Sequence, residues 1–289
     1  MSVSGKMKKM TLAELRRKKR VGDKITMLTA YDYPGASMAD EAGMDMILVG
    51  DSLAMTVLGH PDTVSVTMDE MLHHCKAVQR GAKNAFLVGD MPFMSYHTDP
   101  NEAVKNAGRF IKEARMDAVK LEGGRNQLPA IESIVKAGIP VLGHLGLTPQ
   151  TATALSGYKV QGKTAQSAKI ILEDARFLQT AGCFGIVLEA IPSPLAELIS
   201  AELEIPTIGI GAGNSCDGQV LVYHDLLGLF DKFTPKFVKQ YAQLKPLILD
   251  AITRYAEDVK SGEFPAAEHS FSMKKEELQA LLEGKLEWA

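Results

Sequence analysis

The sequence contains little cysteine: Cys75, Cys183 and Cys216 are the only three among 289 residues. Their odd number and wide spacing, with no CxxC pair, argue against a disulfide framework or a structural zinc site. The same pattern fits a reducing compartment. We therefore expect buried thiols and a cytoplasmic protein.

Long apolar runs and a strong excess of one charge are also missing. No stretch of about 18 apolar residues is present, which argues against a membrane span. The first ten residues, MSVSGKMKKM, lack the apolar centre of a secretory signal, although the lack of acidic residues before Glu14 leaves an organellar presequence open. A net charge of −3 gives no reason to expect a nucleic-acid partner, and we interpret the basic run at residues 16–20 as a solvated helix face.

What the sequence does contain is a repeated pattern in which an apolar run ends in one charged or imidazole side chain. Continuous apolar runs of this kind are typical of strands buried on both faces of a parallel sheet. Ligands of such sheets bind beyond the carboxyl ends of the strands. The residues that end the five runs, which we expect around one site, are Asp51, Asp90, Glu122, His144 and Glu189.

The spacing of these run ends indicates the fold class. The steps from Asp51 to Asp90 and from Asp90 to Glu122 are close to the roughly 30 residues of one strand–helix unit, eight of which fill about 250 residues. We therefore predict an α/β protein with a (β/α)8 TIM barrel, an N-terminal helix and a C-terminal helical tail. The predicted boundaries are residues 1–22 for the N-terminal segment, 23–271 for the barrel and 272–289 for the tail.

Local signals predict several helix starts. Capping-box patterns begin at Thr11 and Thr67. The Asp-Pro-Asn-Glu run from Asp99 has Asp at the N-cap and Pro in the first turn. We also expect Ser193-Pro194 to cap a helix.

The C-terminal half is less regular. We predict the eighth strand at residues 223–230, a helix at 236–259 and a charged amphipathic helix at 273–286. An extended loop is expected at 52–66. The polar segment 148–164 is too long for an ordinary barrel connection, which indicates a functional loop or lid.

Asp51 and Asp90 end neighbouring strands, so their backbones are expected about 4.8 Å apart. Two unpaired carboxylates at that spacing would repel each other. A hard cation such as Mg²⁺, which takes one or two carboxylates, would remove this cost. A pair held by backbone amides and a Lys or Arg explains the spacing equally well.

The other run ends also have two interpretations each. Lys120 and Glu122 lie two residues apart and so share one side of a strand, either as a structural ion pair or as a substrate-binding pair. A lone His144 is more often a satisfied polar residue than a catalyst. Glu189 lies among apolar neighbours, which suits a general base because burial increases the proton affinity of a carboxylate. The glycine run 209–213 is a weak phosphate-binding signal that close backbone packing explains equally well.

Longer strings add specificity. They are ITMLTAYDYP, ILVGDSLAMTVLGH, KLEGG, GHLGLTPQ, GYKVQGK, LEAIP, IPTIGIGAGN, DGQVLVYHDLLGL and FPAAEHSF, in this order. Together they resemble the ketopantoate hydroxymethyltransferase family over about residues 10–271, nearly all of the chain.

The resemblance implies transfer of a hydroxymethyl group from 5,10-methylenetetrahydrofolate to 3-methyl-2-oxobutanoate, giving 2-dehydropantoate, with Mg²⁺ as cofactor. This is the first committed step of pantothenate synthesis. The resemblance also implies a homo-oligomer, a decamer. The residues after Phe271 run past the usual end of the family, and we hypothesise that they pack on a neighbouring subunit.

The resemblance also implies a role for each run end. Asp51 and Asp90 would ligate Mg²⁺, Glu122 would hold a metal-bound water, and Glu189 would be the base. Ser52, Lys120 and Asp90 would contact the keto acid, and His144 would lie close to the reacting groups.

Two other functions stay open at the level of sequence. One is another metal-dependent carbon–carbon bond enzyme, such as a lyase of 2-oxo acids, which would not need reduced folate. The other is a non-catalytic barrel that binds a keto acid. The joint presence of Asp51, Asp90, Lys120, Glu122 and Glu189 argues against the second, because a degenerate binder would not need the base.

Overall fold

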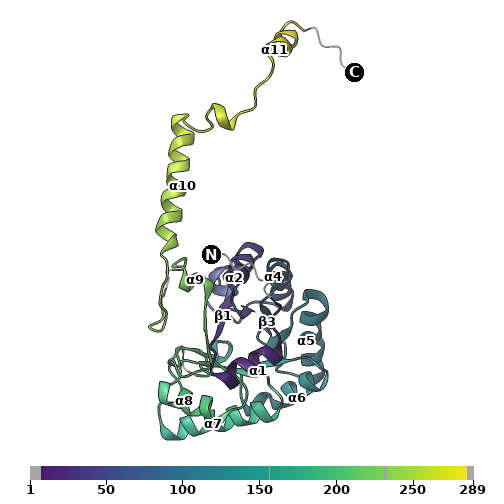
Figure 1. The fold of residues 1–289 in the computed structure, drawn as a ribbon, viewed down its shortest axis with the longest axis vertical. Coiled ribbons are helices and arrows are strands. Elements are labelled where there is room, and N and C mark those ends of the chain that lie inside the picture. The colour runs from purple at the N-terminus through teal and green to yellow at the C-terminus, as the bar shows by residue number, and fades with distance from the viewer. Residues whose placement is uncertain (1–7, 156, 231–232, 285–289) are drawn as a thin grey trace. The chain divides into compact units, whose positions relative to one another are not determined.

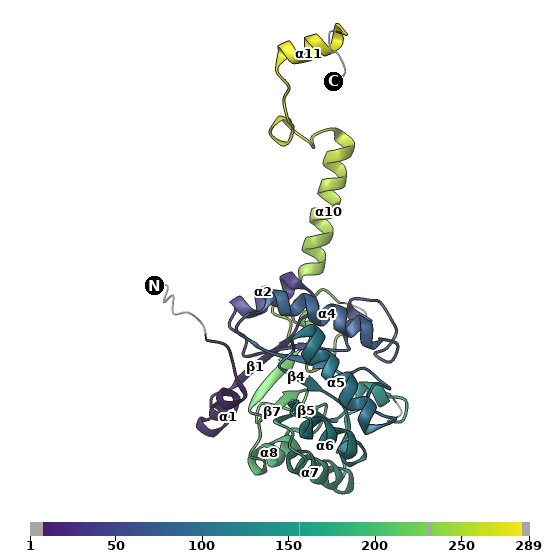
Figure 2. The ribbon, with the colours of Figure 1, turned by 90° about the vertical axis from the view of Figure 1, so that its right-hand side faces the viewer.

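The first of two compact units, Met1–Tyr241, is a closed barrel. The computed structural model describes residues 8–155, 157–230 and 233–284. Within them, eight parallel strands pair in sequence order and the last pairs with the first (Figures 1 and 2). The strands are β1 (Ile25–Thr29), β2 (Met46–Val49), β3 (Phe86–Asp90), β4 (Ala118–Lys120), β5 (Val141–Gly146), β6 (Gly185–Glu189), β7 (Thr207–Ile210) and β8 (Gly218–Leu221). The predicted (β/α)8 fold is confirmed.

Helices on the outside of the barrel connect the strands (Figure 2). The helices of this unit are α1 (Leu12–Val21), α2 (Tyr33–Glu41), α3 (Leu53–Thr56), α4 (Met68–Gly81), α5 (Pro100–Ala114), α6 (Leu128–Lys136), α7 (Ala165–Thr180), α8 (Ser193–Glu202) and α9 (Tyr223–Leu226). Short 3₁₀ turns occur at Arg125–Gln127 and Pro149–Thr151.

Alternation along the strands sorts the core into two clusters. Residues such as Met27 and Val88 belong to an inner cluster inside the barrel, whereas Leu28 and Leu87 pack towards the helices. Leu15 of α1 belongs to the inner cluster and is 1% exposed. Helix α1 therefore closes the amino-terminal end of the barrel.

Helix starts follow the predicted signals with one exception. The side chains of Thr11, Thr67 and Asp99 each accept a hydrogen bond from a backbone N–H in the first turn of their helix, and Thr67 forms a full capping box. The prediction for Ser193 was wrong, because the N-cap of α8 is Pro192, with no side-chain bond, and Ser193 is the first helical residue.

The predicted eighth strand was also wrong. Strand β8 ends at Leu221, and residues 223–226 form the short helix α9. Gly218 explains the error, because a Cβ there would lie only 2.5 Å from the Ile25 carbonyl oxygen. Strand β8, which closes the barrel, therefore starts with a glycine that interrupts the apolar pattern. The more apolar run at residues 223–230 leaves the sheet and begins with α9.

Two predicted loops contain structure. Helix α3 lies inside the segment 52–66, and the turn Pro149–Thr151 lies near the start of the segment 148–164.

The second unit, Ala242–Ala289, contains α10 (Leu244–Ser261), a 3₁₀ turn (Ala267–His269) and α11 (Lys275–Leu282). Helix α10 starts later than the predicted residue 236. This start puts Pro246 in the first turn, the only part of a helix that tolerates its missing N–H. Helix α11 is shorter than predicted, and residues 285 and 286 of that prediction lie outside the described residues. Among the described helices, none is long and apolar enough to cross a membrane.

Candidate active site

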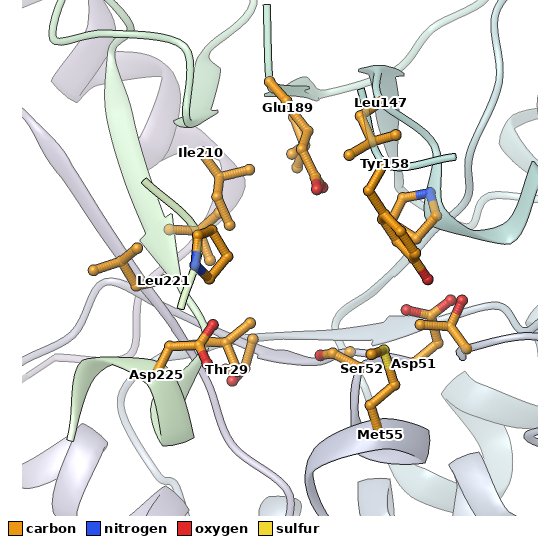
Figure 3. Close-up of a pocket in the computed structure, with 18 of the residues that line it drawn as sticks. Thr29, Asp51, Ser52, Met55, Leu147, Tyr158, Glu189, Ile210, Leu221 and Asp225 are labelled. Atoms are coloured by element: carbon orange, nitrogen blue, oxygen red, sulfur yellow. The ribbon is translucent and has the colours of Figure 1, made fainter. Parts of the chain in front are cut away.

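A cavity of about 650 Å³ lies at the carboxyl ends of the barrel strands. Glu189 and Ser52 project from opposite sides of this space, with Asp51 at its edge (Figure 3). The remaining wall is mostly apolar. All of the predicted site residues line the cavity: Asp51, Ser52, Asp90, Lys120, Glu122, His144 and Glu189.

The two-residue period of the strands explains this convergence. Asp90, Lys120, His144 and Glu189 each lie two residues after a member of the inner cluster, so their side chains point into the barrel. They form the layer above the apolar interior, where the strands end.

Asp51 reaches the cavity by a different route. It lies two residues beyond the end of β2 and is out of phase with the inward-facing Met46 and Leu48. The turn into α3 reverses its direction, and its backbone N–H donates to Asp90 Oδ2 at 3.2 Å. Through this hydrogen bond, the turn brings together Asp51 and Asp90, which we predicted at the ends of neighbouring strands.

Asp90 and Lys120 form a buried ion pair. Lys120 Nζ donates to both carboxylate oxygens of Asp90, at 2.7 and 2.8 Å, and both side chains are almost fully buried. Burial raises the pKa of Asp90, although Lys120 opposes the rise. The surrounding carboxylates, Asp90 first, outweigh the opposite effect of burial and raise the pKa of Lys120. Lys120 is therefore a permanent positive charge in the cavity.

The protein compensates a negative charge on Asp51 poorly. Its Oδ2 accepts one hydrogen bond, from Gln150 Nε2 at 2.9 Å. Burial, and then the charges of Asp90 and Glu122, raise the pKa of Asp51 well above its usual value. A divalent cation beside Asp51 and Asp90 would offset this cost, so the donor set fits Mg²⁺.

The protein would supply few ligands to the cation. The described residues contain no group of three or more His, Cys, Asp and Glu side chains arranged to hold a metal ion. Mg²⁺ commonly binds one or two carboxylates and completes its shell with water and substrate oxygens. The Asp51–Asp90 pair meets that requirement.

His144 lies between two glutamates. Its Nδ1 is 3.4 Å from Glu122 Oε1, and its Nε2 is 3.2 Å from Glu189 Oε2. Neither contact has the alignment of a good hydrogen bond, so these are close ion pairs. Glu122, His144 and Glu189 thus form a row of three side chains in the cavity wall, which we call the His144 file.

The charge of His144 follows from these neighbours. Burial and Lys120 lower its pKa, but Glu122 and Glu189 outweigh them and raise it to about 9. Burial raises the pKa of Glu122, but His144 and Lys120 outweigh it, and the net shift is downwards. At neutral pH, His144 is an imidazolium held by ionised Glu122.

Two buried residues that the sequence did not predict organise this network. Gln150, 3% exposed, donates from its backbone to Glu122 Oε2 at 3.0 Å and from its side chain to Asp51. Tyr96 donates its hydroxyl hydrogen to Gln150 Oε1 at 2.6 Å and accepts from the Glu122 N–H. Gln150 therefore links Asp51 to the His144 file.

Ser52 is positioned by a third unpredicted residue, Tyr31. The two hydroxyl oxygens lie 2.8 Å apart, and Tyr31 also accepts a hydrogen bond from Thr29 at 2.8 Å. Burial raises the pKa of Tyr31 to about 12, so it stays a neutral hydroxyl. The only sequence signal for Tyr31 is its position in the string ITMLTAYDYP, two residues after the end of β1.

The loop 148–164 contributes Tyr158, Lys159 and Val160 to the cavity wall, in addition to Gln150 behind it. Its predicted involvement in the site is consistent with this lining, and its closure as a lid stays a prediction. The glycine run packs closely, because a Cβ at Gly213 would lie 2.1 Å from Ser193 Oγ. Close packing therefore accounts for that glycine.

Known proteins are similar in sequence to this chain over most of its length. A family model described as ketopantoate hydroxymethyltransferase matches residues 9–267. The 3-methyl-2-oxobutanoate hydroxymethyltransferase of Oleidesulfovibrio alaskensis is 58% identical over 277 residues, which cover 96% of each chain. The protein of that name from Syntrophobacter fumaroxidans is 60% identical over 258 residues, 89% of this chain and 92% of the relative.

Solved structures share the fold at low sequence identity. Phosphoenolpyruvate phosphomutase from Streptomyces platensis subsp. rosaceus aligns with a TM-score of 0.60 and 16% identity, over 95% of this chain and 96% of that chain. At this identity the likeness concerns the barrel alone.

Proposed function

The chain belongs to the ketopantoate hydroxymethyltransferase family, and from this premise we propose that it transfers a hydroxymethyl group from 5,10-methylenetetrahydrofolate to 3-methyl-2-oxobutanoate. The product would be 2-dehydropantoate, the committed precursor of pantothenate. Membership makes the chain a transferase enzyme. Cytoplasmic location remains part of the proposal.

The proposed reaction balances with one water. Carbon C3 of the keto acid loses a proton and forms a bond to the methylene carbon of the donor. The two carbon–nitrogen bonds of that methylene group break, and water supplies the hydroxyl oxygen. The C3 proton and one water proton end on the two nitrogens of tetrahydrofolate.

The keto acid would bind at the positive end of the cavity. Lys120 is buried and charged, so it can pair with the carboxylate of the substrate and with the negative charge that develops on its keto oxygen. Ser52, held by Tyr31, can donate a hydrogen bond to the same substrate. Fixed donors in a buried site cost little reorganisation during the reaction.

Glu189 would remove the C3 proton. It lines the cavity at the end of β6, and its side chain is 16% exposed, whereas that of Glu122 is 2% exposed. Of the two carboxylates beside His144, Glu189 is therefore the more accessible to a substrate. His144 would hold Glu189 in place and carry a proton next to it.

Asp51 and Asp90 would hold the Mg²⁺. When bound, the cation would supply Lewis-acid chemistry, polarising the keto group and making the neighbouring C3 proton more acidic. Gln150 would keep Asp51 oriented towards the ion.

One observation carries the proposal: the seven side chains that the family resemblance assigns to the reaction all line the same cavity. They come from five separate segments, at the ends of β2, β3, β4, β5 and β6, so a chance meeting of all seven is a poor explanation. The two carboxylate–cation pairs of the reaction, one at Lys120 and one at His144, are already formed in this state.

The test is an assay with purified protein, 3-methyl-2-oxobutanoate, 5,10-methylenetetrahydrofolate and Mg²⁺, with product detected by mass spectrometry. Matched samples contain a chelator or omit the folate. We expect 2-dehydropantoate only when metal and folate are both present. Absence of product from folded protein would overturn the proposal and shift weight to another reaction of a keto acid at this site.

A further inference from the structure

One carboxylate in the cavity has no role in the proposed chemistry. Asp225 lies on α9, which follows β8, and lines the cavity. Figure 3 shows it beside Thr29, with its carboxylate towards the open space and on the opposite side of the view from Asp51. Asp225 is thus separated from the proposed metal site.

The Asp225 carboxylate is also without a partner. Among the residues that the structure describes, none donates a hydrogen bond or forms an ion pair to it. The cavity lining includes the apolar residues Ile210, Leu221, Val222 and Phe230, and Figure 3 shows Ile210 and Leu221 on the same side of the view as Asp225. Burial alone raises the pKa of Asp225 to about 6. A half-buried carboxylate with no donor is costly, and a ligand with N–H groups would offset that cost.

The cavity is larger than the keto acid needs. Cavities of about 300–1,000 Å³ hold drug-sized ligands, and this one has about 650 Å³. A small keto acid held by Lys120 and Ser52 would fill only the part near Asp51. The apolar part near Asp225 is left for a larger, flat molecule.

We propose that Asp225 anchors the reduced pterin ring of the folate donor by accepting hydrogen bonds from its 2-amino group and its N3–H. This inference rests on the proposed function. The two N–H groups lie side by side on one edge of a planar ring, and the two oxygens of a carboxylate match such a pair. The apolar side chains Ile210, Leu221 and Val222 would contact the ring.

This anchor would determine the orientation of the donor. With the amino edge of the pterin at Asp225, the opposite edge, which carries N5 and the methylene group, would point back across the cavity. That direction leads towards Glu189 and Asp51 (Figure 3). The reacting carbon of the donor would then face the C3 carbon of the keto acid.

A structural alternative is available within the same cavity. Lys236 also lines it, and in solution Lys236 could turn to pair with Asp225. In that case Asp225 would hold the loop after α9 and would not distinguish one pterin from another. The experiment must therefore vary the ligand as well as the residue.

The first measurement compares Asp225→Asn with the wild type in two assays. One is turnover against 5,10-methylenetetrahydrofolate. The other is exchange of the C3 proton of 3-methyl-2-oxobutanoate with deuterium in D₂O, which needs no folate. We expect the KM for the donor to rise about 10- to 100-fold, the loss expected for one or two hydrogen bonds to a charged group, with the exchange rate unchanged.

The second measurement changes the ligand. A tetrahydrofolate analogue with a methyl group in place of the 2-amino group should bind the wild type about 10-fold or more weakly than tetrahydrofolate. It should lose much less affinity for Asp225→Asn. Asp69→Asn, which removes an exposed carboxylate on α4 outside the cavity lining, is the matched control and should behave as wild type.

The outcomes separate the two proposals. An unchanged donor KM in Asp225→Asn, or an equal loss of analogue affinity in both proteins, would overturn the role of Asp225 while wild-type transfer continues. Wild-type protein that exchanges the C3 proton but never uses the folate would contradict the proposed function instead, and with it the pterin site.

Discussion

At the scale of single residues, the carboxylates of the cavity differ in how they are compensated. Asp90 forms an ion pair with Lys120. Glu122 lies against His144 and accepts a hydrogen bond from the Gln150 N–H. Asp51 has one neutral amide, and Glu189 shares only a protonated His144. The two less compensated carboxylates are the ones to which the proposed function assigns the cation and the substrate.

Glu189→Gln tests the base. The amide keeps the shape of the side chain but cannot take a proton. We expect turnover and C3 deuterium exchange to fall by at least about 100-fold, because a general base contributes about 10²- to 10⁴-fold, while Mg²⁺ and keto acid still bind. Glu197→Gln, an exposed change on α8, is the control. Substantial residual turnover would remove Glu189 as the base.

Asp51→Asn tests the metal site. The wild type should gain thermal stability when Mg²⁺ is added, and the variant should gain little. In chelator, the variant should be the more stable protein by about 1–3 kcal/mol, because it no longer buries a poorly compensated charge. Differential scanning calorimetry measures both effects. Equal Mg²⁺ stabilisation of the two proteins would argue against Asp51 as a ligand.

His144 predicts a pH dependence. Its pKa in the folded protein, about 9, lies above the ordinary value of 6.5. Protonation therefore stabilises the folded state fully below pH 6.5, and this stabilisation is lost as the pH rises to 9. Its upper limit is about 3 kcal/mol. Denaturant unfolding at several pH values should show the difference between wild type and His144→Gln shrinking from pH 6 to pH 9.5. A constant difference would contradict a buried imidazolium.

The residues that the sequence could predict are those that follow the period of a strand. Asp90, Lys120, His144 and Glu189 end apolar runs in phase with the barrel interior, so their direction could be derived. Gln150 and Asp225 lie on a 3₁₀ turn and a four-residue helix, where no period fixes a side chain. Gln150 matters through its contacts with distant segments, and Asp225 through its place in a cavity that distant segments form together.

At the scale of elements, the turn Pro149–Thr151 deserves a test because it carries Gln150. The backbone and side chain of this one residue hold two carboxylates from different strands, Asp51 and Glu122. The loop therefore links the proposed metal site to the His144 file.

Gln150→Ala should remove the side-chain half of this link. Asp51 would lose its buried donor, at a cost of about 1–3 kcal/mol in stability. We expect weaker Mg²⁺ binding by isothermal titration and a lower kcat. Thr153→Ala changes an exposed side chain of the same loop and should match the wild type. Wild-type Mg²⁺ affinity in Gln150→Ala would show that Asp51 is oriented without this residue.

Helices with strong local start signals were predicted well. Strand β8, which depends on pairing with neighbouring strands, was not. Thr67 and Asp99 fix helix starts through bonds within one turn. Strand β8 has only four residues and begins with Gly218, so its pairing with β1 and β7 determines it. No pattern within the strand could have predicted it.

At the scale of the whole molecule, the second unit presents an apolar stripe on helix α10. Helix α10 has no buried residue, and Ile248, Ile252, Tyr255 and Val259 repeat at helical spacing along it. Such an apolar stripe needs a partner surface. We therefore keep the proposal of a homo-oligomer, a decamer by family resemblance, as its explanation.

Truncation after Phe271 tests the tail. If residues 272–289 pack on a neighbouring subunit, their removal should reduce the assembly size or shift its dissociation to higher protein concentration. Light scattering coupled to size-exclusion chromatography, over a range of concentrations, measures this. Unchanged assembly would count against the tail hypothesis and leave α10 as the remaining candidate.

Helix α1 closes the amino-terminal end of the barrel with Leu15, and this closure has a kinetic consequence. With that end closed, both substrates must use the same entrance, and Lys120, which we propose holds the keto acid, is nearly fully buried. A bulky donor seated outside would trap a small molecule already inside and keep out a late one. Steady-state kinetics should therefore be ordered, with the keto acid entering first and 2-dehydropantoate leaving after tetrahydrofolate.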